Sequence, residues 1–359
     1  MKSTSGAYYI GLDHVRALAA LLVFSWHFLP FCAPPAQEVS PLLSLFVQGH
    51  TGVSLFMCLS GYLFAKLLDD GVINWRAFWT NRALRLLPLL LFVILVKAVL
   101  VLTGDGKISG YIKDCLKGVF QPTLPNGGWS ITVEFHFYLL LPVFLVLLKR
   151  SKRLFLLLLP VFILVRLLLY LHYGTVQNLA YMTILGRVDQ FALGIFAFHI
   201  QSVFVKRHIV AAATMVLFLS FHAFFHAAGG FQGDPRSEFL PPLWIVMTTI
   251  EGVAYSVLIA WYDSSFQHSA GPISRFIGLL GTYSYSNYLL HPFFVPHIGR
   301  VFSRFMYLGG MNMRILASVL AFVSMVPVTY LSYRFIESPF LKFRRRYIQR
   351  FTPAAPPVS

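Results

Sequence analysis

The stretch Arg85–Thr103, RLLPLLLFVILVKAVLVLT, decides the fold class, because after its first residue it carries a single charge, Lys97. A helix needs about 20 mainly apolar residues to cross a bilayer. Leu12–Pro34 and Leu154–His172 are apolar runs of the same kind. Only 12% of the 359 residues are charged, whereas soluble domains carry about 25%. We therefore predict an all-α fold, a polytopic transmembrane helical bundle.

Hydropathy divides the chain into ten expected spans, separated by Pro, Gly, Asn and Asp turn signals. The first apolar run is too long for the core of a signal peptide and no small-residue cleavage site follows it, so we expect no cleavable signal. We expect one membrane domain over residues 1–345 and a short basic, Pro-rich tail over 346–359. The expected spans are 12–34, 48–67, 86–104, 129–148, 154–172, 181–204, 209–228, 241–262, 276–298 and 313–336.

Lys and Arg outside these spans are distributed unequally between the two sides. If the N-terminus is cytoplasmic, the cytoplasmic side holds seventeen of them and the opposite side six. Because cytoplasmic loops of membrane proteins are enriched in Lys and Arg, both termini are predicted to be cytoplasmic. This bias explains the net charge of +16 without nucleic acid as a partner. The basic run Lys342–Arg350 is interpreted as a topology anchor near anionic headgroups.

The cysteines and histidines give little indication of a metal. Cys32, Cys58 and Cys115 have no CxxC spacing, and a Cys32–Cys115 disulfide would require both residues to face an oxidising space. The twelve histidines are spread along the chain, and we expect no HxxxH pair of metal ligands among them. We predict no metal site.

Ionisable residues inside the first span are candidates for function, because charges in hydrocarbon are costly. Arg16 and His27 are eleven residues apart, which places them on one helix face roughly 17 Å apart along the axis. Asp13 precedes Arg16 by three residues and lies on the same stripe. The alternative is an interfacial Asp13–Arg16 ion pair with His27 as a packing group.

The fourth span shows the same kind of pattern. Ser130, Glu134 and Tyr138 follow each other at intervals of four and share a face, and Trp129 opens the span. Counting from the span ends, Glu134 and His27 both lie roughly 8–10 Å below the outer boundary, and His291 comes out at nearly the same level. These three titratable groups are expected to converge on one buried cavity.

The remaining charges allow two interpretations. Arg82 and Arg85 form an Arg-x-x-Arg pair at the cytoplasmic entrance of the third span, with both guanidinium groups on one face; this suits phosphate or pyrophosphate binding. The alternative is a pair of topology anchors. Arg166, Arg187 and Asp189 are interpreted as structural ion pairs, and Arg334 with Glu337 as an i,i+3 pair.

Taken in order, these motifs resemble the acyltransferase family 3 membrane enzymes, which acylate extracytoplasmic glycans. Six segments carry the resemblance over nearly the whole chain, with Ile131 where the family's Trp-Ser-Leu element has Leu. They are Leu12-Asp13-x-x-Arg16 with His27, Gly52-Val53-x-x-Phe56-x-x-x-Ser60-Gly61-Tyr62, Arg82-x-x-Arg85-x-x-Pro88, Trp129-Ser130-x-x-x-Glu134-x-x-x-Tyr138, Gly281-x-x-Ser284-Tyr285-x-x-Tyr288-Leu289-x-His291, and Tyr333-Arg334-x-x-Glu337-x-Pro339.

The resemblance implies an O-acyltransferase in a bacterial inner membrane. It implies a cytoplasmic acyl-CoA donor, acetyl-CoA by default, and no permanently bound cofactor. The acceptor would be a hydroxyl of a glycan or glycolipid at the outer side. Some relatives carry an extra extracytoplasmic hydrolase-like domain, which we do not find in this sequence; a partner acyltransferase or polysaccharide assembly proteins are therefore possible partners.

The mechanism that these residues allow places the CoA phosphates at Arg82 and Arg85, with Arg16 guiding the donor. His27 is the candidate base or acyl carrier, since the ordinary imidazole pKa is about 6.5. Glu134 would orient its imidazole. Ser60, Trp129, Ser130, Tyr138, Asp13 and His291 are candidates for the cavity.

Two other classes remain open from sequence. In a transporter, the intramembrane charges would form a substrate or ion pathway. The third class is a noncatalytic scaffold of a polysaccharide assembly complex.

Overall fold

The fold is that of a computed structural model, which describes residues 8–31, 39–68, 71–104, 106–233 and 240–349. Ten long helices are α1 (Ile10–Phe28), α3 (Gly52–Leu68), α4 (Trp75–Leu102), α6 (Trp129–Arg150), α8 (Leu158–Tyr173), α10 (Ile184–His199), α11 (His208–Ala227), α13 (Met247–Ser265), α15 (Ser284–Phe305) and α16 (Met311–Ser324). Shorter helices join them: α2 (Pro41–Val47), α5 (Ile108–Lys117), α7 (Lys152–Leu156), α9 (Gln177–Met182), α12 (Leu240–Leu243), α14 (Pro272–Thr282), α17 (Val326–Ser332) and α18 (Ser338–Leu341). The described strands are β1 (Val72–Ile73) and β2 (Ile348–Gln349).

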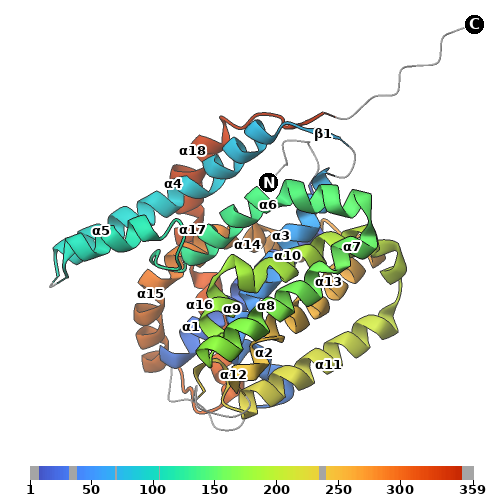
Figure 1. The fold of residues 1–359 in the computed structure, drawn as a ribbon. Coiled ribbons are helices and arrows are strands. Elements are labelled where there is room, and N and C mark those ends of the chain that lie inside the picture. Colours follow the sequence, from blue (N-terminus) through green and yellow to red (C-terminus); the bar gives the residue numbers. More distant parts are fainter. Residues whose placement is uncertain (1–7, 32–38, 69–70, 105, 234–239, 350–359) are drawn as a thin grey trace, which may run out of the picture.

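The long helices confirm the predicted all-α bundle, and each overlaps one expected span (Figure 1). Within the described residues, seven segments are long and apolar enough to cross a membrane. The expected spans at α10, α13 and α15 are not among these seven; α10 is only 16 residues long. The count of ten spans and the cytoplasmic termini stay predictions. The seven segments are Ile10–Phe31, Gly49–Leu68, Trp75–Leu102, Trp129–Arg150, Lys152–Tyr173, His208–Gln232 and Met311–Leu341.

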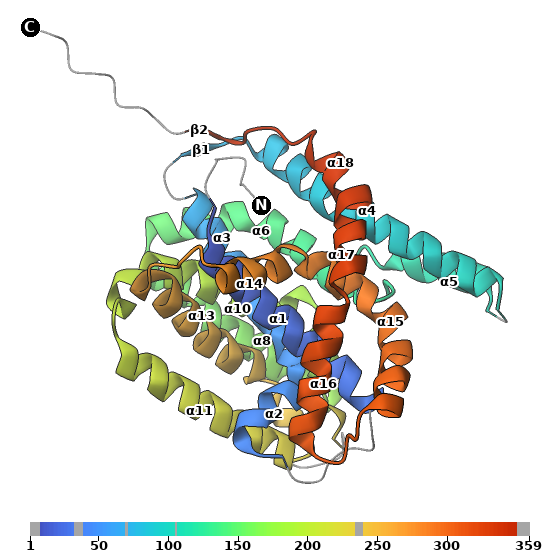
Figure 2. The same ribbon diagram turned by 180° about the vertical axis from the view of Figure 1, so that it is seen from behind.

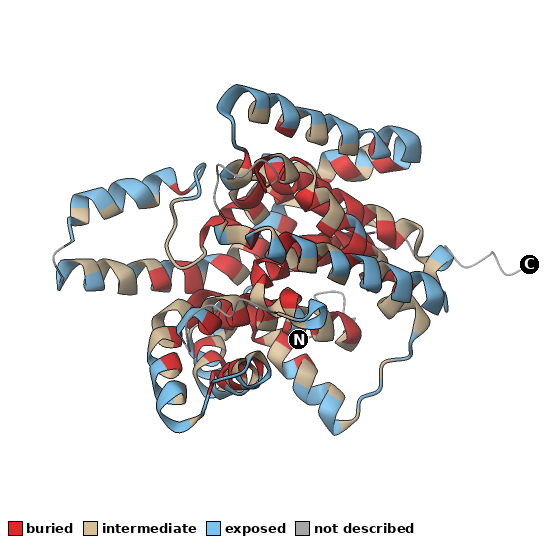
Figure 3. Ribbon diagram, turned by 90° about the horizontal axis from the view of Figure 1, so that it is seen from below, coloured by how far each residue is buried: buried red, intermediate tan, exposed pale blue. Residues whose placement is uncertain are grey.

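Apolar side chains cover the outside of the bundle as well as its centre. Only 11% of the most apolar stretch of Lys152–Tyr173 is buried, against 72% for Gly49–Leu68. Figure 3 shows the buried residues in the middle of the bundle and exposed ones along the outer helices. An apolar surface of this extent fits hydrocarbon rather than water, so the protein is an integral membrane protein.

Helix α3 runs through the centre and packs most closely against α10. A Cβ atom added at Gly61 would lie 2.1 Å from the carbonyl oxygen of Phe191, and one added at Gly194 would lie 2.0 Å from that of Cys58. The two backbones can touch here because both contact positions are glycine. Gly61, one residue of the Gly52–Tyr62 motif, is thus a small-residue helix contact.

Helix α4 begins eleven residues before the third expected span. Asn74 caps it, since its side-chain oxygen accepts a hydrogen bond from the Ala77 backbone N–H at 3.0 Å. The first turns of α4 carry charged residues, so their hydropathy is too low to mark a membrane span. The cap nevertheless allows the helix to begin there, because it satisfies a backbone N–H of the first turn. Arg82 and Arg85 consequently stand inside a continuous helix, not at its entrance.

The last expected span is interrupted. After α16 and α17, Tyr333–Glu337 form a π-helical turn. The predicted i,i+3 pair of Arg334 and Glu337 is wrong: Arg334 is exposed, and the buried Glu337 instead accepts a hydrogen bond from the Ser286 hydroxyl. In the wider π turn, residues three apart no longer share a face.

The chain after α18 folds back onto α4. Strand β2 pairs antiparallel with β1, and the Asn74 backbone N–H donates to the Tyr347 carbonyl at 2.9 Å. Figure 2 shows β2, β1, α18 and the start of α4 side by side at one end of the molecule. This end is the one at which α3 finishes, because β1 follows α3 directly.

Candidate functional site

The first cavity measures about 780 Å³, including the open space at its mouth. It is called the inner pocket after the side of the membrane on which the sequence leads us to expect Arg82 and Arg85. It brings together residues from α1, α3, α4, α6 and α15. Its polar lining consists of Arg16, Ser60, Arg82, Arg85, Ser130, Glu134, Tyr138, Ser284, Tyr285 and Tyr288. Seven residues singled out from the sequence, on four different helices, thus meet in one pocket.

Arg82 and Arg85 face the inner pocket together, as their spacing on α4 predicts. The Arg82 guanidinium lies 5.3 Å from the Phe64 ring and 5.7 Å from the Phe78 ring. Arg82 is 7% exposed, and among the described residues its Nε has no hydrogen-bond partner. Aromatic faces compensate a buried cation only in part, so this guanidinium can still bind an anion in the pocket.

Glu134 and Tyr138 form a local pair on α6. The Tyr138 hydroxyl donates a hydrogen bond to the Glu134 carboxylate. The Ser130 hydroxyl donates to the Gly127 carbonyl at 3.0 Å. All three residues of the predicted stripe line the inner pocket, which therefore contains a carboxylate and hydroxyl groups together with the arginines.

Arg16 reaches the inner pocket from α1, while Asp13 does not line it. Asp13 is buried and accepts a hydrogen bond from the Arg16 guanidinium within the same helix. The ion pair considered as the plainer alternative is therefore present. The ion pair orients the Arg16 guanidinium, and Asp13 therefore acts through Arg16 rather than at the pocket itself.

The second cavity, called the outer pocket, contains about 570 Å³ and holds two histidines. The rings of His27 on α1 and His291 on α15 lie 4.7 Å apart between centroids. Nδ1 of His27 is 2.9 Å from the Val23 carbonyl, and Nδ1 of His291 is 3.1 Å from the Asn287 carbonyl. A carbonyl oxygen only accepts, so each Nδ1 carries the proton and each Nε2 keeps its lone pair. Each Nε2 is thus a potential base or nucleophile.

A tight turn before α6 joins the wall of the outer pocket to α15. Asn126 and Gly127 have positive φ of 52° and 77°, a conformation that Gly adopts without strain and Asn tolerates. The Tyr288 hydroxyl donates to the Gly127 carbonyl at 3.2 Å, and the Asn126 amide donates to the Leu289 carbonyl at 3.3 Å. The turn thereby sets Trp129, which follows it, against the outer pocket.

The two pockets are neighbours along the bundle. Val53 and Tyr288 line both. On α1, Arg16 lines the inner pocket and His27 the outer one, and on α6 Glu134 lines the inner pocket and Trp129 the outer one. The two helices thus run past the pockets in opposite directions. Tyr288 lies between the inner pocket with its arginines and the outer pocket with its histidines.

The expected meeting of His27, Glu134 and His291 occurs only in part. His27 and His291 come together, but Glu134 lies in the inner pocket and is bonded to Tyr138 rather than set against the imidazole of His27. The reason is the position of α6. Its first residue, Trp129, is already at the outer pocket, and five residues at 1.5 Å each carry Glu134 roughly 7–8 Å further in.

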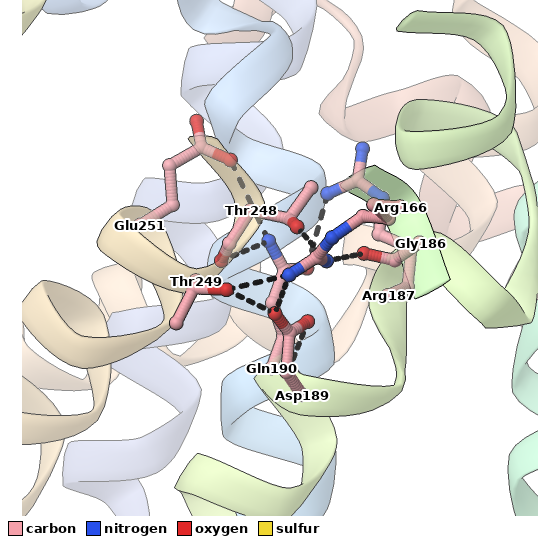
Figure 4. A network of polar contacts seen from close by, with 8 residues as sticks. All are labelled: Arg166, Gly186, Arg187, Asp189, Gln190, Thr248, Thr249 and Glu251. Carbon is pink, nitrogen blue, oxygen red and sulfur yellow. Dashed lines mark hydrogen bonds and ion pairs between the residues drawn. The ribbon is translucent and has the colours of Figure 1, made fainter. Parts of the chain in front are cut away.

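A buried polar network lies beside these pockets (Figure 4). Arg166 on α8 and Asp189 on α10 form an ion pair at 2.7 Å with both side chains fully buried. Arg187 donates to the Ser54 hydroxyl at 2.6 Å, and Ser54 donates to Glu251 on α13 at 2.5 Å. The interpretation of Arg166, Arg187 and Asp189 as structural ion pairs fits Arg166 and Asp189, whereas among the described residues Arg187 donates its hydrogen bonds to uncharged groups.

The expectation that no HxxxH pair occurs is wrong, because His222 and His226 have the i,i+4 spacing of metal ligands on α11. His226 Nδ1 lies 3.0 Å from the Gln48 amide nitrogen, and His222 Nε2 lies 3.8 Å from a Glu251 oxygen. The two histidines thus turn to different partners. In the part of the chain that the structure describes, no cluster of three His, Cys, Asp or Glu residues could hold a metal ion.

Several residues of the site were not foreseen from the sequence. Tyr288 entered only as part of a motif, although it separates the two pockets. Asn126 appeared as a turn residue, and Tyr181, which faces Trp129 with ring centroids 5.0 Å apart, was not considered. Glu251 is the one acidic residue in the eighth expected span, and this signal could have identified it.

The fold and the site define a polytopic membrane protein with an arginine-lined pocket and a histidine pocket stacked within one bundle. A model described as an acyltransferase domain, Acyl_transf_3, matches residues 9–334. The chain belongs to the acyltransferase 3 family.

Three relatives illustrate this membership. A Bacillus subtilis protein named "Putative peptidoglycan O-acetyltransferase YrhL" is 28% identical over 40% of this chain and 25% of its own length. A Staphylococcus aureus "Putative O-acetyltransferase" is 30% identical over 41% of this chain and 26% of its own length. The Streptomyces mycarofaciens "Acyltransferase MdmB" is 30% identical over 39% of this chain and 40% of its own length. The matches thus span about a quarter of the first two relatives, and no solved structure matches the chain.

Proposed function

We propose that this protein transfers an acyl group, acetyl by default, from a cytoplasmic acyl-CoA to a hydroxyl of a cell-envelope or exported glycan. The observation that carries the proposal is the stacking of the two pockets. The inner pocket, which is lined by arginines, adjoins the outer pocket, in which two histidines each present an Nε2 lone pair, and Tyr288 lines both pockets. A donor with a phosphorylated end and a long arm suits this geometry.

The phosphates of the donor bind Arg82 and Arg85 in the inner pocket. Planar guanidinium groups suit phosphate oxygens, and Arg82 brings a buried donor atom without a described partner. The pantetheine arm then runs past Arg16 and Ser60 towards Tyr288, in the direction of His27. This orientation carries the thioester towards the boundary between the pockets.

His27 is the base in the direct route. Its Nε2 takes the proton of the acceptor hydroxyl while the hydroxyl oxygen attacks the thioester carbonyl carbon. The carbon–sulfur bond breaks, the ester forms, and the proton passes to the departing CoA thiolate. The bond from Nδ1 to the Val23 carbonyl holds the ring in the tautomer that this step requires.

A covalent route uses the same atoms in two steps. Nε2 of His27 attacks the thioester and expels CoA thiolate, and the acceptor hydroxyl then attacks the acylated imidazole. In the second step His291 is the base, since its Nε2 is buried without a described partner and its ring adjoins that of His27. The two routes differ in whether labelled protein accumulates when the acceptor is withheld.

The acceptor binds on the outer side, near Trp129 and Tyr181. Aromatic faces such as these suit the apolar face of a sugar ring. A glycan acceptor agrees with the name of the Bacillus subtilis relative, which mentions peptidoglycan. A bacterial inner membrane would give the enzyme cytoplasmic CoA on one side and envelope glycan on the other.

The transport interpretation would assign the buried charges to a pathway. None of the networked residues Arg166, Arg187, Asp189 and Glu251 is among those that line the inner or the outer pocket. Their hydrogen bonds are directed at one another, at neighbouring hydroxyl groups and at helix backbone. A structural role explains them without a pathway.

The test uses purified protein in nanodiscs with acetyl-labelled acetyl-CoA and an envelope glycan extract. Wild type is expected to remove label from CoA and deposit it on glycan. His27→Ala should be almost inactive, and Arg85→Ala should be slower than wild type when acetyl-CoA is limiting. His172→Ala, which changes an exposed histidine on α8, is the matched control and should keep wild-type turnover. Full activity in His27→Ala would overturn the mechanism, and no turnover by wild type with any glycan would favour transport.

A further inference from the structure

The basic segment after the last helix is fixed against the start of α4 rather than simply adjoining the membrane. The Asn81 side chain makes two hydrogen bonds to the Arg345 backbone, donating to its carbonyl at 2.6 Å and accepting from its N–H at 2.9 Å. The Tyr347 ring is 2% exposed and lies 5.5 Å from the Phe78 ring. Together with the β1–β2 pairing, these contacts set the register of the segment (Figure 2).

The anchoring point adjoins the inner pocket. Phe78 contacts both Tyr347 and the Arg82 guanidinium. Asn81, which binds the Arg345 backbone, directly precedes Arg82 in the chain and is fully buried. The fold-back is thus built onto the same helical turn that presents the buried arginine of the pocket.

Arg344 differs in exposure from the two arginines that follow it, and its Nε donates to the Leu341 carbonyl at 3.3 Å. It is partly buried, whereas Arg345 and Arg346 are exposed. Burial lowers the pKa of Arg344, and the positive charges of Arg85 and Arg82 lower it further. The Arg345 backbone is bonded to Asn81, which directly precedes Arg82, so the chain holds the neighbouring Arg344 beside the turn of α4 that presents Arg82. Cations held near one another favour a multiply charged anion between them.

We propose that Arg344 is a third phosphate-binding residue of the donor site, and that the C-terminal fold-back completes the site for the phosphorylated nucleotide end of acyl-CoA. The inference rests on the proposed function and deepens it. The buried Arg82, with an Nε that lacks a described partner, is the independent sign of an anion site at this position. The tail thereby has a role in substrate binding beyond that of a topology anchor.

The test compares Arg344→Gln with Arg346→Gln, which removes the same charge from an exposed position of the same segment. The full chain is placed in nanodiscs of neutral phosphatidylcholine, so that anionic headgroups do not compete, and equilibrium binding of labelled CoA is measured. One charge-assisted bond to phosphate corresponds to about a tenfold change in Kd. Arg344→Gln should therefore weaken CoA binding about tenfold, and Arg346→Gln should not.

A second measurement separates binding from folding. Acetyl-pantetheine lacks the nucleotide phosphates, so its turnover should be equal in wild type and Arg344→Gln if the variant is folded. Arg344→Lys should recover part of the CoA affinity, since it restores the charge but not the planar fork. Adding phosphatidylglycerol to the nanodiscs should leave the wild-type CoA affinity within twofold; strong competition would show a lipid-headgroup site instead.

Equal CoA affinity in wild type and Arg344→Gln, or equal weakening by both glutamine variants, would overturn the inference. If Arg85→Gln still weakened CoA binding in that case, the proposed function would stand and only the role of Arg344 would be rejected. Absence of CoA binding by wild type would overturn the proposed function and the inference together.

Discussion

The ion pair of Arg166 and Asp189 offers a sharp test of what holds the bundle together. Arg166 is fully buried and donates to Asp189 at 2.7 Å, to the Gly186 carbonyl at 2.9 Å, and to the hydroxyls of Thr248 and Thr249. These contacts tie α8 to α10 and α13 (Figure 4). Replacing Arg166 by Met removes all of them at once and leaves a buried carboxylate behind.

The magnitude follows from comparing two effects. Interhelical hydrogen bonds in membranes average only about 0.6 kcal/mol each. An uncompensated buried charge costs about 3–5 kcal/mol. Asp189 would still accept from Thr249 and from the Gln190 N–H at 3.0 Å, but neither donor is a cation. The charge effect dominates, and Arg166→Met should lower the free energy of unfolding by about 3–5 kcal/mol.

The assay is SDS-induced unfolding of purified protein, followed by circular dichroism. The double variant Arg166→Met with Asp189→Leu removes both charges and should recover more than half of the loss, since replacing a whole buried pair with apolar residues is often neutral. Arg300→Met, at an exposed position, serves as the control. A loss below 1 kcal/mol in Arg166→Met, or a double variant no more stable than the single one, would refute this reasoning.

Three further outcomes are expected. His27→Ala should lower kcat about 10²–10⁴-fold, the usual contribution of a general base, while CoA binding measured by equilibrium dialysis stays unchanged; weakened binding would place His27 at the donor instead. Arg85→Gln should raise KM for acetyl-CoA about tenfold, the value of a lost charge-assisted bond, and leave acetyl-pantetheine turnover unaltered, whereas a loss with both donors would point to a structural role. Gly61→Ala should destabilise the protein by about 1–3 kcal/mol, because its Cβ would lie 2.1 Å from the Phe191 carbonyl oxygen; wild-type resistance to SDS would contradict this close packing.

The sequence predicted the fold class and most of the polar lining of the inner pocket because both depend on local spacing. Apolar runs locate helices, and intervals of three or four residues place side chains on one face, as for Arg82 with Arg85 and for Glu134 with Tyr138. Depth is different, because it depends on where a helix begins relative to its neighbours. Glu134 was therefore expected beside His27 and lies in the other pocket instead.

Contacts between segments distant in the chain were the least predictable. Tyr288 separates the pockets only because α15 packs across the turn at Gly127. The Arg345 backbone reaches Asn81, next to Arg82 in the chain, only because the chain folds back and strand β2 pairs with β1. The expected pair of Arg334 and Glu337 failed for a local reason, since hydropathy does not reveal a π-helical turn.

The central claim, that an acyl group passes from the inner to the outer pocket, is tested most directly by sidedness. Membrane vesicles of known orientation would receive labelled acetyl-CoA on one face and a glycan acceptor on the other. The account predicts transfer only when acetyl-CoA reaches the face that carries Arg82 and Arg85 and the acceptor lies on the opposite face. Transfer to an acceptor on the same face as the donor would contradict it.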